Sequence, residues 1–320
     1  LGGGDCLAGL SLKLDVPTTV VTSPRHFDEQ LPLYNCRFSD FLNKNGVKYL
    51  VVNDLSSKEI LQQCPNSLGI SFGAAWIFKK QFIDEFAGNL INAHGALLPR
   101  DRGAGGFSWR ILMGDSRGAS LLHLVDTGVD TGDIVDCQTY NFPADCRKPI
   151  DHYKYSVERY GPFLDSFFQK LKSGHNFRTS YQQEHLSTYW PRLNTSINGF
   201  INWSWDLTQV ERFICAFDDP YSGASSFIAG IESPVSLKSC RTIKSDGLFH
   251  PFQYGIVYRI HEGSIFIASN GGSIVIDDIR DSKGNNMFRI VNLGDRFFTP
   301  VDFLEASMKS RPVYTAKGLN

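Results

Sequence analysis

An excess of basic residues, which a nucleic-acid-binding chain of this size usually has, is missing from this sequence. Its 320 residues carry 32 Lys and Arg against 33 Asp and Glu, for a formal net charge of −1. The basic side chains form only short clusters, such as Lys79-Lys80 and Arg147-Lys148. Because binding to a polyanion depends on many phosphate contacts by Lys and Arg, the composition disfavours a nucleic-acid partner.

Paired cysteines and long apolar runs are missing as well. The seven cysteines form no C-x-x-C pair, which argues against a disulfide framework and against a zinc site. No apolar run approaches the roughly 18–20 residues that span a bilayer, and the chain does not open on a charged and then apolar signal segment. We therefore expect a cytoplasmic protein with reduced thiols and no membrane partner.

Strands and helices alternate in the first half of the sequence. With 42% hydrophobic residues, the chain has enough apolar material for a packed core. The pattern predicts a glycine turn leading into a helix over residues 6–14, and a long helix over Pro149–Lys172. Further strands are predicted over residues 18–21, 47–52, 68–72, 89–92, 119–125 and 134–142, and short helices over 57–64 and 79–86. The alternation predicts an α/β fold with a Rossmann-like, mostly parallel sheet and helices on both faces. We also expect a first strand to precede Leu1.

The composition changes after about residue 174. The next segment, to residue 198, is polar and aromatic and is typical of a linker across the surface. A helix is predicted over residues 207–217 with Asp206 as its N-cap. Short strands broken by glycine follow over residues 224–228, 255–260, 264–269 and 273–279. Their spacing predicts a small β-rich domain, an OB-like barrel. We expect a catalytic domain with its linker over residues 1–195 and a β-rich domain over residues 196–320.

The segment 91–103, INAHGALLPRDRG, places two polar side chains where a predicted strand ends. Asn92 and His94 are two residues apart, so in extended backbone both side chains point to the same side. An amide and an imidazole side by side can hydrogen-bond a carbonyl oxygen as it becomes an oxyanion. A second glycine-bearing turn, DTGVDTGD over residues 126–133, contains Asp130. Its carboxylate could hold His94 protonated and accept a proton.

Each of these three residues also has an ordinary structural explanation. A single histidine at a strand end is usually a satisfied polar residue, Asn92 could cap a turn, and Asp130 could close an Asx-turn. It is the combination, with its spacing and its glycines, that favours a chemical role.

The combination resembles the superfamily of formyltransferases that use 10-formyltetrahydrofolate. Its motif, Asn-x-His-Gly-(Ser/Ala)-Leu-Leu-Pro with a later Asp-x-Gly-x-Asp-x-Gly, is matched by residues 92–99 and 126–132. The resemblance implies that Asn92, His94 and Asp130 are catalytic. It also implies a folate co-substrate bound beside Leu97, Leu98, Pro99, Gly128 and Val129.

The similarity continues weakly into the second half of the chain. Residues 200–203 (FINW) and 216–224 (AFDDPYSGA) resemble the start of the small barrel of methionyl-tRNA formyltransferases and of enzymes that formylate nucleotide-linked amino sugars. Glycinamide ribonucleotide formyltransferases lack that domain, which disfavours a role in purine synthesis.

The resemblance implies a reaction in which a neutral amine attacks the formyl carbon on N10 of the folate. Asn92 and protonated His94 would stabilise the oxyanion, while Asp130 would keep His94 charged and accept the proton of the amine. No metal is expected, because the sequence shows no cluster of metal ligands. His123 and the neighbouring Asp126 and Asp133 are interpreted as supporting or structural residues.

The acceptor amine belongs either to a nucleotide-linked amino sugar, which we favour, or to methionyl-tRNA. Residues 22–34 lack the basic insertion by which the tRNA enzymes hold the acceptor stem, and offer only Arg25 and His26. Where the amino-arabinose enzymes have a phosphate-binding arginine, this sequence has Ala104. Neither pattern is therefore matched in full.

The substrate-binding candidates are Gly4, Arg102, Phe107 and Trp109. The two aromatic residues would stack on a base or sugar, or would pack between the domains. A folate hydrolase and a folate-binding protein without activity are further alternatives, and a homodimer is a possible assembly.

Overall fold

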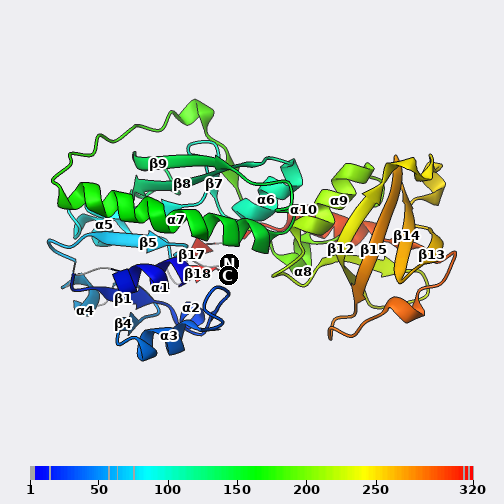
Figure 1. Cartoon of the computed structure of the whole chain (residues 1–320), viewed down its shortest axis with the longest axis horizontal. Helices are drawn as coiled ribbons and strands as arrows, with labels where there is room; N and C mark the ends of the chain where they lie inside the picture. Colours follow the sequence, from blue (N-terminus) through cyan, green and yellow to red (C-terminus); the bar gives the residue numbers. More distant parts are fainter. Residues whose placement is uncertain are drawn as a thin grey trace.

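An α/β part and a β-rich part make up this protein, whose computed structural model describes residues 4–13, 16–56, 58–62, 64–74, 76–312, 314–315 and 318–319. Figure 1 shows the two parts at opposite ends of the molecule. The elements of the first part are α1 (Gly4–Lys13), β1 (Thr19–Thr22), α2 (Pro24–Phe27), β2 (Gln30–Leu31), β3 (Cys36–Arg37), α3 (Phe38–Lys44), β4 (Lys48–Val51), α4 (Lys58–Leu61), β5 (Gly69–Phe72), α5 (Lys80–Asp84), β6 (Leu90–His94), β7 (Arg102–Gly103), α6 (Gly106–Met113), β8 (Arg117–Leu124), β9 (Ile134–Asn141) and α7 (Pro149–Lys172).

The remaining elements follow the long helix α7. They are η1 (Glu184–Leu186), β10 (Tyr189–Trp190), α8 (Thr195–Asn198), α9 (Leu207–Ala216), β11 (Ala224–Ile228), β12 (Val235–Ile243), η2 (Lys244–Asp246), η3 (Pro251–Gln253), β13 (Val257–His261), β14 (Ser264–Ser269), β15 (Gly272–Arg280), η4 (Phe288–Ile290), β16 (Phe297–Phe298), α10 (Val301–Lys309), β17 (Tyr314–Thr315) and β18 (Gly318–Leu319). Within the described ranges, no helix is long and apolar enough to cross a bilayer. Residues 1–3, 14, 57 and 63, which belong to the predicted glycine turn and the predicted helices 6–14 and 57–64, lie outside those ranges.

The main sheet of the α/β part has the strand order β5-β6-β8-β9 and is mixed. β5 and β6 pair in parallel, as β1 and β4 do in a separate pair, whereas β8 is antiparallel to both β6 and β9. The loop between β8 and β9 contains no helix, and a connection of that kind returns the chain antiparallel. The predicted α/β class is confirmed, with β8 running opposite to β5, β6 and β9.

Helices cover both faces of this sheet. Leu90 and Ile91 are neighbours on β6 and therefore point to opposite faces. Ile91 packs with Phe163 on α7, and Leu90 packs with Phe82 on α5. Full burial of such side chains stabilises the fold by roughly 1.5–3 kcal/mol each.

The long helix α7 holds the end of β6 in place, and Figure 1 shows it running along the sheet. It begins at the predicted residue, where Pro149 needs no N–H partner and Asp151 accepts the Lys148 N–H at 2.9 Å. The hydroxyl of Tyr160 donates to the backbone oxygen of His94 and accepts the Leu121 N–H at 3.1 Å. The helix thereby fixes the strand end that carries the predicted site.

The β-rich part is a curled antiparallel sheet with the order β13-β14-β15-β12-β11-β16. Its two edges meet at a bridge between Ile256 and Arg296, so the sheet curls into a half-barrel. The predicted N-cap is present, since the Asp206 carboxylate accepts the Gln209 N–H at 2.9 Å. The central strand β12 was missed, because only one of its faces is buried and its sequence is largely polar.

The two parts are joined through α6 and α9. Ile111 on α6 is buried in the hydrophobic core of the β-rich part. Ser108 on the same helix donates to the backbone oxygen of Ala216 at 2.8 Å.

Three thiols, those of Cys64, Cys215 and Cys240, are buried, whereas Cys137 is exposed. The division at residues 195 and 196 stays a prediction.

Candidate active site

Neighbouring strands bring two histidines and an asparagine together. Asn92 and His94 lie at the end of β6, and His123 on β8 is the direct cross-strand partner of Asn92. Because opposite residues of an antiparallel pair point to the same face, the two side chains meet. Nδ2 of Asn92 lies 3.1 Å from Nε2 of His123.

Asp130 reaches this group from the loop between β8 and β9. Its Oδ1 lies 3.7 Å from Nδ1 of His94 and 3.5 Å from Nε2 of His123. Its Oδ2 accepts the backbone N–H of Gly103 at 2.8 Å. Asp130 has a positive φ of 54°, a left-handed conformation that aspartate tolerates better than most residues. The predicted trio therefore converges at one point, although its catalytic role stays a prediction.

The carboxyl of Asp130 is held ionised by its neighbours. Burial raises its pKa, but the nearby rings of His94 and His123 and the hydrogen bond from Gly103 outweigh burial and lower the pKa to about 2. The site therefore holds a permanent negative charge within 4 Å of both imidazole rings.

Backbone carbonyls orient both imidazole rings. Nε2 of His94 lies 2.8 Å from the backbone oxygen of Asp101, and Nδ1 of His123 lies 2.7 Å from that of Leu124. A carbonyl can only accept, so each of these nitrogens carries a hydrogen. The remaining nitrogens, Nδ1 of His94 and Nε2 of His123, both face Asp130.

The amide of Asn92 is engaged inside the site. Its Nδ2 is directed at Nε2 of His123 and, at 3.4 Å, at Oδ1 of Asp130. To donate to an oxyanion, the Asn92 amide would therefore have to give up its contact with one of these two acceptors.

A cavity of about 670 Å³ is lined by all four of these residues. Its volume lies in the range of roughly 300–1,000 Å³ that is usual for small-molecule sites. Charged and aromatic side chains also line it, among them Arg25, His26, Arg102, Arg192, Trp76, Tyr189, Trp190 and Tyr221. The cavity therefore offers cationic donors and flat apolar surfaces close to the trio.

The predicted folate-binding residues divide into two groups. Gly128 and Val129 line the cavity. Leu98 is instead buried against Ala119 and Leu121, with Leu97 packed on the same cluster, and Pro99 follows through a cis peptide bond. Leu97 and Leu98 therefore pack into a hydrophobic cluster with β8. The folate-binding roles of all five residues stay predictions.

Two predicted substrate-binding residues are occupied by other contacts. Trp109 stacks on Trp190 with ring centroids 5.1 Å apart, and its Nε1–H donates to the backbone oxygen of Pro191 at 2.7 Å. Gly4 begins α1, where an added Cβ would lie 2.8 Å from Leu31. These contacts favour a packing role for Trp109. They also explain why position 4 has a residue without a side chain.

Arg102 and Phe107 both line the cavity. Arg102 is buried, and its guanidinium donates to Gln182 at 3.1 Å and to Glu184 at 2.8 Å. Phe107 packs edge-on against Phe142. Their substrate-binding roles stay predictions.

Gln182, in the segment predicted to be a surface linker, supports the Asp130 turn and was not predicted to do so. Its amide donates to the backbone oxygens of Asp130 at 2.9 Å and Gly132 at 2.6 Å. Only 2% of Gln182 is exposed, whereas Tyr181 and Gln183 on either side of it are exposed, so the segment crosses the surface and this one side chain points inward. No local pattern marks the residue, because its partners are about fifty positions away.

His94, His123 and Asp130 also form a group that could hold a metal ion, since one ligand atom from each lies within 4.8 Å of the others. The prediction that the chain has no cluster of metal ligands was wrong, because His123 joins the site across β6 and β8. A reaction without a metal stays a prediction.

Comparison with known proteins identifies the family. The profile described as formyl transferase matches residues 61–144, and the one described as formyl transferase, C-terminal domain, matches residues 195–289. This chain belongs to the formyltransferase family. As a formyltransferase it is a transferase enzyme, and formyl transfer is the class of its reaction.

Curated relatives of this formyltransferase include methionyl-tRNA formyltransferases. The one from Syntrophus aciditrophicus is 26% identical over 238 residues, which are 74% of this chain and 73% of the relative. The one from Geotalea uraniireducens is 30% identical over 211 residues, and the alignment covers 66% of this chain and 63% of the relative.

A solved structure shares the fold of this formyltransferase. It is the N-formyltransferase from Helicobacter canadensis in complex with folinic acid and dTDP-3-aminofucose, with a TM-score of 0.62 and 18% identity. The superposition covers 85% of this chain and 94% of the other.

Proposed function

We propose that this formyltransferase moves the formyl group of 10-formyltetrahydrofolate to the primary amine of a nucleotide-linked amino sugar. The observation that carries the proposal is the convergence of Asn92, His94 and Asp130 on one wall of a small-molecule cavity. The folate co-substrate is supported by the family and by the folinic acid in the Helicobacter canadensis structure.

In the proposed reaction the amine lone pair attacks the formyl carbon, forming a C–N bond and a tetrahedral oxyanion. His94 and Asn92 donate hydrogen bonds to that oxygen. Asp130 accepts the proton released by the amine, directly or through a water molecule, and the bond from the formyl carbon to N10 then breaks. The proton goes to N10, so the products are the formamide and tetrahydrofolate.

The sugar nucleotide is favoured by the charges that line the cavity. Arg25 and Arg192 both line it, and neither forms an ion pair with another described residue. Free guanidinium groups bind phosphate oxygens well. Trp190 and Tyr221 line the same cavity and offer aromatic faces to a nucleobase. A net charge of −1 gives no general attraction for a long polyanion.

Methionyl-tRNA is the second candidate acceptor, and the curated relatives favour it. A tRNA would have to be held largely by the outer surface, where residues 22–34 contribute only Arg25 and His26 as cationic groups.

The test is formyl transfer from 10-formyltetrahydrofolate to a panel of nucleotide-linked amino sugars, with charged initiator methionyl-tRNA and an amine-free reaction in parallel. We expect a sugar product heavier by one formyl group, absent with Asp130→Asn. Formylation of the tRNA alone would establish the second candidate. Steady tetrahydrofolate release without amine would indicate a hydrolase, and no turnover in any arm would contradict the proposal. A homodimer stays a prediction.

A further inference from the structure

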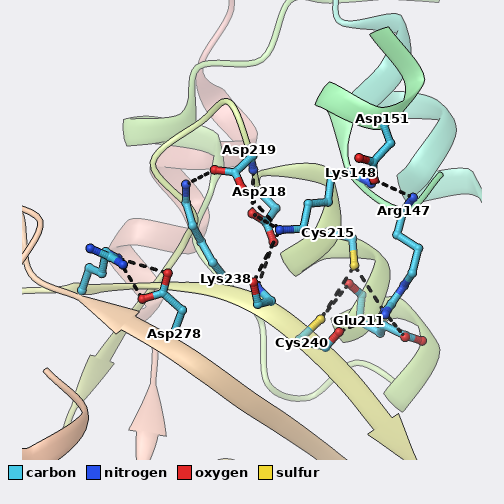
Figure 2. A network of polar contacts seen from close by, with 12 residues as sticks. Arg147, Lys148, Asp151, Glu211, Cys215, Asp218, Asp219, Lys238, Cys240 and Asp278 are labelled. Atoms are coloured by element: carbon cyan, nitrogen blue, oxygen red, sulfur yellow. Dashed lines mark hydrogen bonds and ion pairs between the residues drawn. The ribbon is translucent and has the colours of Figure 1, made fainter. Parts of the chain in front are cut away.

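A pair of buried thiols lies far along the chain from the proposed active site. Cys215 lies in the last turn of α9, and Cys240 lies on the neighbouring strand β12. Their sulfur atoms are 3.8 Å apart, and 6% and 4% of the two residues are exposed. Figure 2 shows the two sulfurs facing each other beside the side chains of Arg147 and Glu211. Among the described residues, no other two thiols are in contact.

Arg147 brings a positive charge to this pair from the segment before α7. Its Nη2 lies 3.7 Å from Sγ of Cys215 and 3.0 Å from the backbone oxygen of Cys240, and donates to the carboxylate of Glu211 at 2.6 Å (Figure 2). The side chains of Arg147 and Glu211 are 42% and 25% exposed. The thiols therefore lie next to an ion pair that is partly exposed at the surface.

The environment separates the two thiols chemically. The S–H of Cys240 and then the Arg147 charge stabilise a Cys215 thiolate and lower the pKa of Cys215 despite burial. The same hydrogen bond, together with burial, raises the pKa of Cys240. The two thiols therefore differ, and Cys215 is the one that lies against the Arg147 guanidinium.

We propose that Cys215 and Cys240 form an oxidative modification site that takes a hydroperoxide. The Cys215 thiolate attacks the terminal oxygen of the peroxide, the O–O bond breaks, and Cys215 becomes a sulfenic acid. Cys240 then attacks that sulfur, forming the S–S bond and releasing water. Two thiols and one hydrogen peroxide give one disulfide and two waters.

The geometry permits the second step with a small movement. A disulfide has a sulfur–sulfur distance of about 2.05 Å, so the sulfurs must approach by roughly 1.8 Å. Cys215 lies near the end of α9, where a helix yields more easily than in its interior. The bond would join α9 to β12 at the place where Arg147 reaches across from the α/β part.

The test treats the full chain with hydrogen peroxide and maps its peptides without reduction over time. We expect a peptide pair joined through Cys215 and Cys240 to form before the exposed Cys137 is oxidised. Cys240→Ser should instead accumulate a Cys215 sulfenic acid, which dimedone traps. Oxidation of Cys137 first, with no joined pair, would overturn the proposal.

Variants of the neighbouring arginine separate the role of charge from fold stability. Arg147→Gln should slow formation of the disulfide by about tenfold, because less thiolate is present. The matched control is Arg280→Gln, which removes an ion pair of similar exposure between Arg280 and Asp278 on β15. Equal rates in the two variants would contradict the assigned role of Arg147. If Arg147→Gln fails to fold, trapping in Cys240→Ser still decides whether Cys215 is the attacking thiol.

Discussion

The Asp130 carboxylate connects the His94 imidazole to the backbone of Gly103 on β7. Oδ1 lies 3.7 Å from Nδ1 of His94, and Oδ2 accepts the Gly103 N–H at 2.8 Å. One oxygen therefore faces the imidazole while the other fixes the carboxylate in position. Any change that moves Gly103 or the Asp130 turn acts on the same imidazole.

Removing either member of the His94–Asp130 pair should abolish turnover without unfolding the protein. We expect His94→Ala and Asp130→Asn to lower kcat by about 10²–10⁴-fold, the range for lost acid–base or oxyanion contacts. Formyl-transfer assays with thermal unfolding measure both effects. The exposed His175→Ala is the control, and near-normal kcat in Asp130→Asn would contradict the assignment.

Gln182 should act by positioning the Asp130 turn. Gln182→Ala leaves the backbone oxygens of Asp130 and Gly132 without their donor, which costs about 1–3 kcal/mol for a buried group. We expect lower unfolding stability together with reduced kcat, measured by urea unfolding and steady-state assay. Its exposed neighbour provides the control Gln183→Ala; an equal effect there would argue against the positioning role.

A side chain at Gly103 should disrupt the site through the backbone. Gly103 has a φ of +98°, and an added Cβ would lie 2.3 Å from the backbone oxygen of Trp190. Gly174 has a φ of +74° with nothing within 4 Å, so Gly174→Ala carries the conformational cost of about 1 kcal/mol alone. We expect Gly103→Ala to be clearly less stable than Gly174→Ala and much less active. Comparable melting temperatures for the two would contradict this reading.

The stability contributed by Asp130 should depend on pH. Its folded pKa of about 2 lies below the ordinary value of 3.8, so its contribution is fully present above pH 3.8 and is lost as the pH falls toward 2. The difference corresponds to roughly 2 kcal/mol. Unfolding of the wild type and Asp130→Asn should therefore differ by a constant amount at neutral pH, and the difference should shrink in acid. A difference that stays constant down to pH 3 would show that ionisation is not its source.

Metal removal should leave catalysis unchanged, whereas an added transition metal should inhibit it. Zn²⁺ prefers histidine and carboxylate ligands, and His94, His123 and Asp130 offer one atom each within 4.8 Å. A bound ion would occupy the groups that the proposed reaction needs. The check is kcat after EDTA dialysis and after Zn²⁺ titration. Loss of activity with EDTA that Zn²⁺ restores would instead indicate a resident metal.

The sequence by itself determined the features that depend on neighbouring residues. The long apolar periodicity of Pro149–Lys172 and the cap at Asp206 are local, and the structure confirms both. The same holds for the pairing of Asn92 and His94 at a strand end, because alternate residues of a strand share a face.

Tertiary structure alone decided the features that join distant segments. His123 enters the site because β8 pairs with β6 in one particular register, and Gln182 enters because the segment after α7 folds back under the Asp130 turn. The Cys215–Cys240 contact likewise depends on how α9 packs on β12. Strand register and packing depend on the whole core rather than on local preference, so no short pattern in the sequence encodes these contacts.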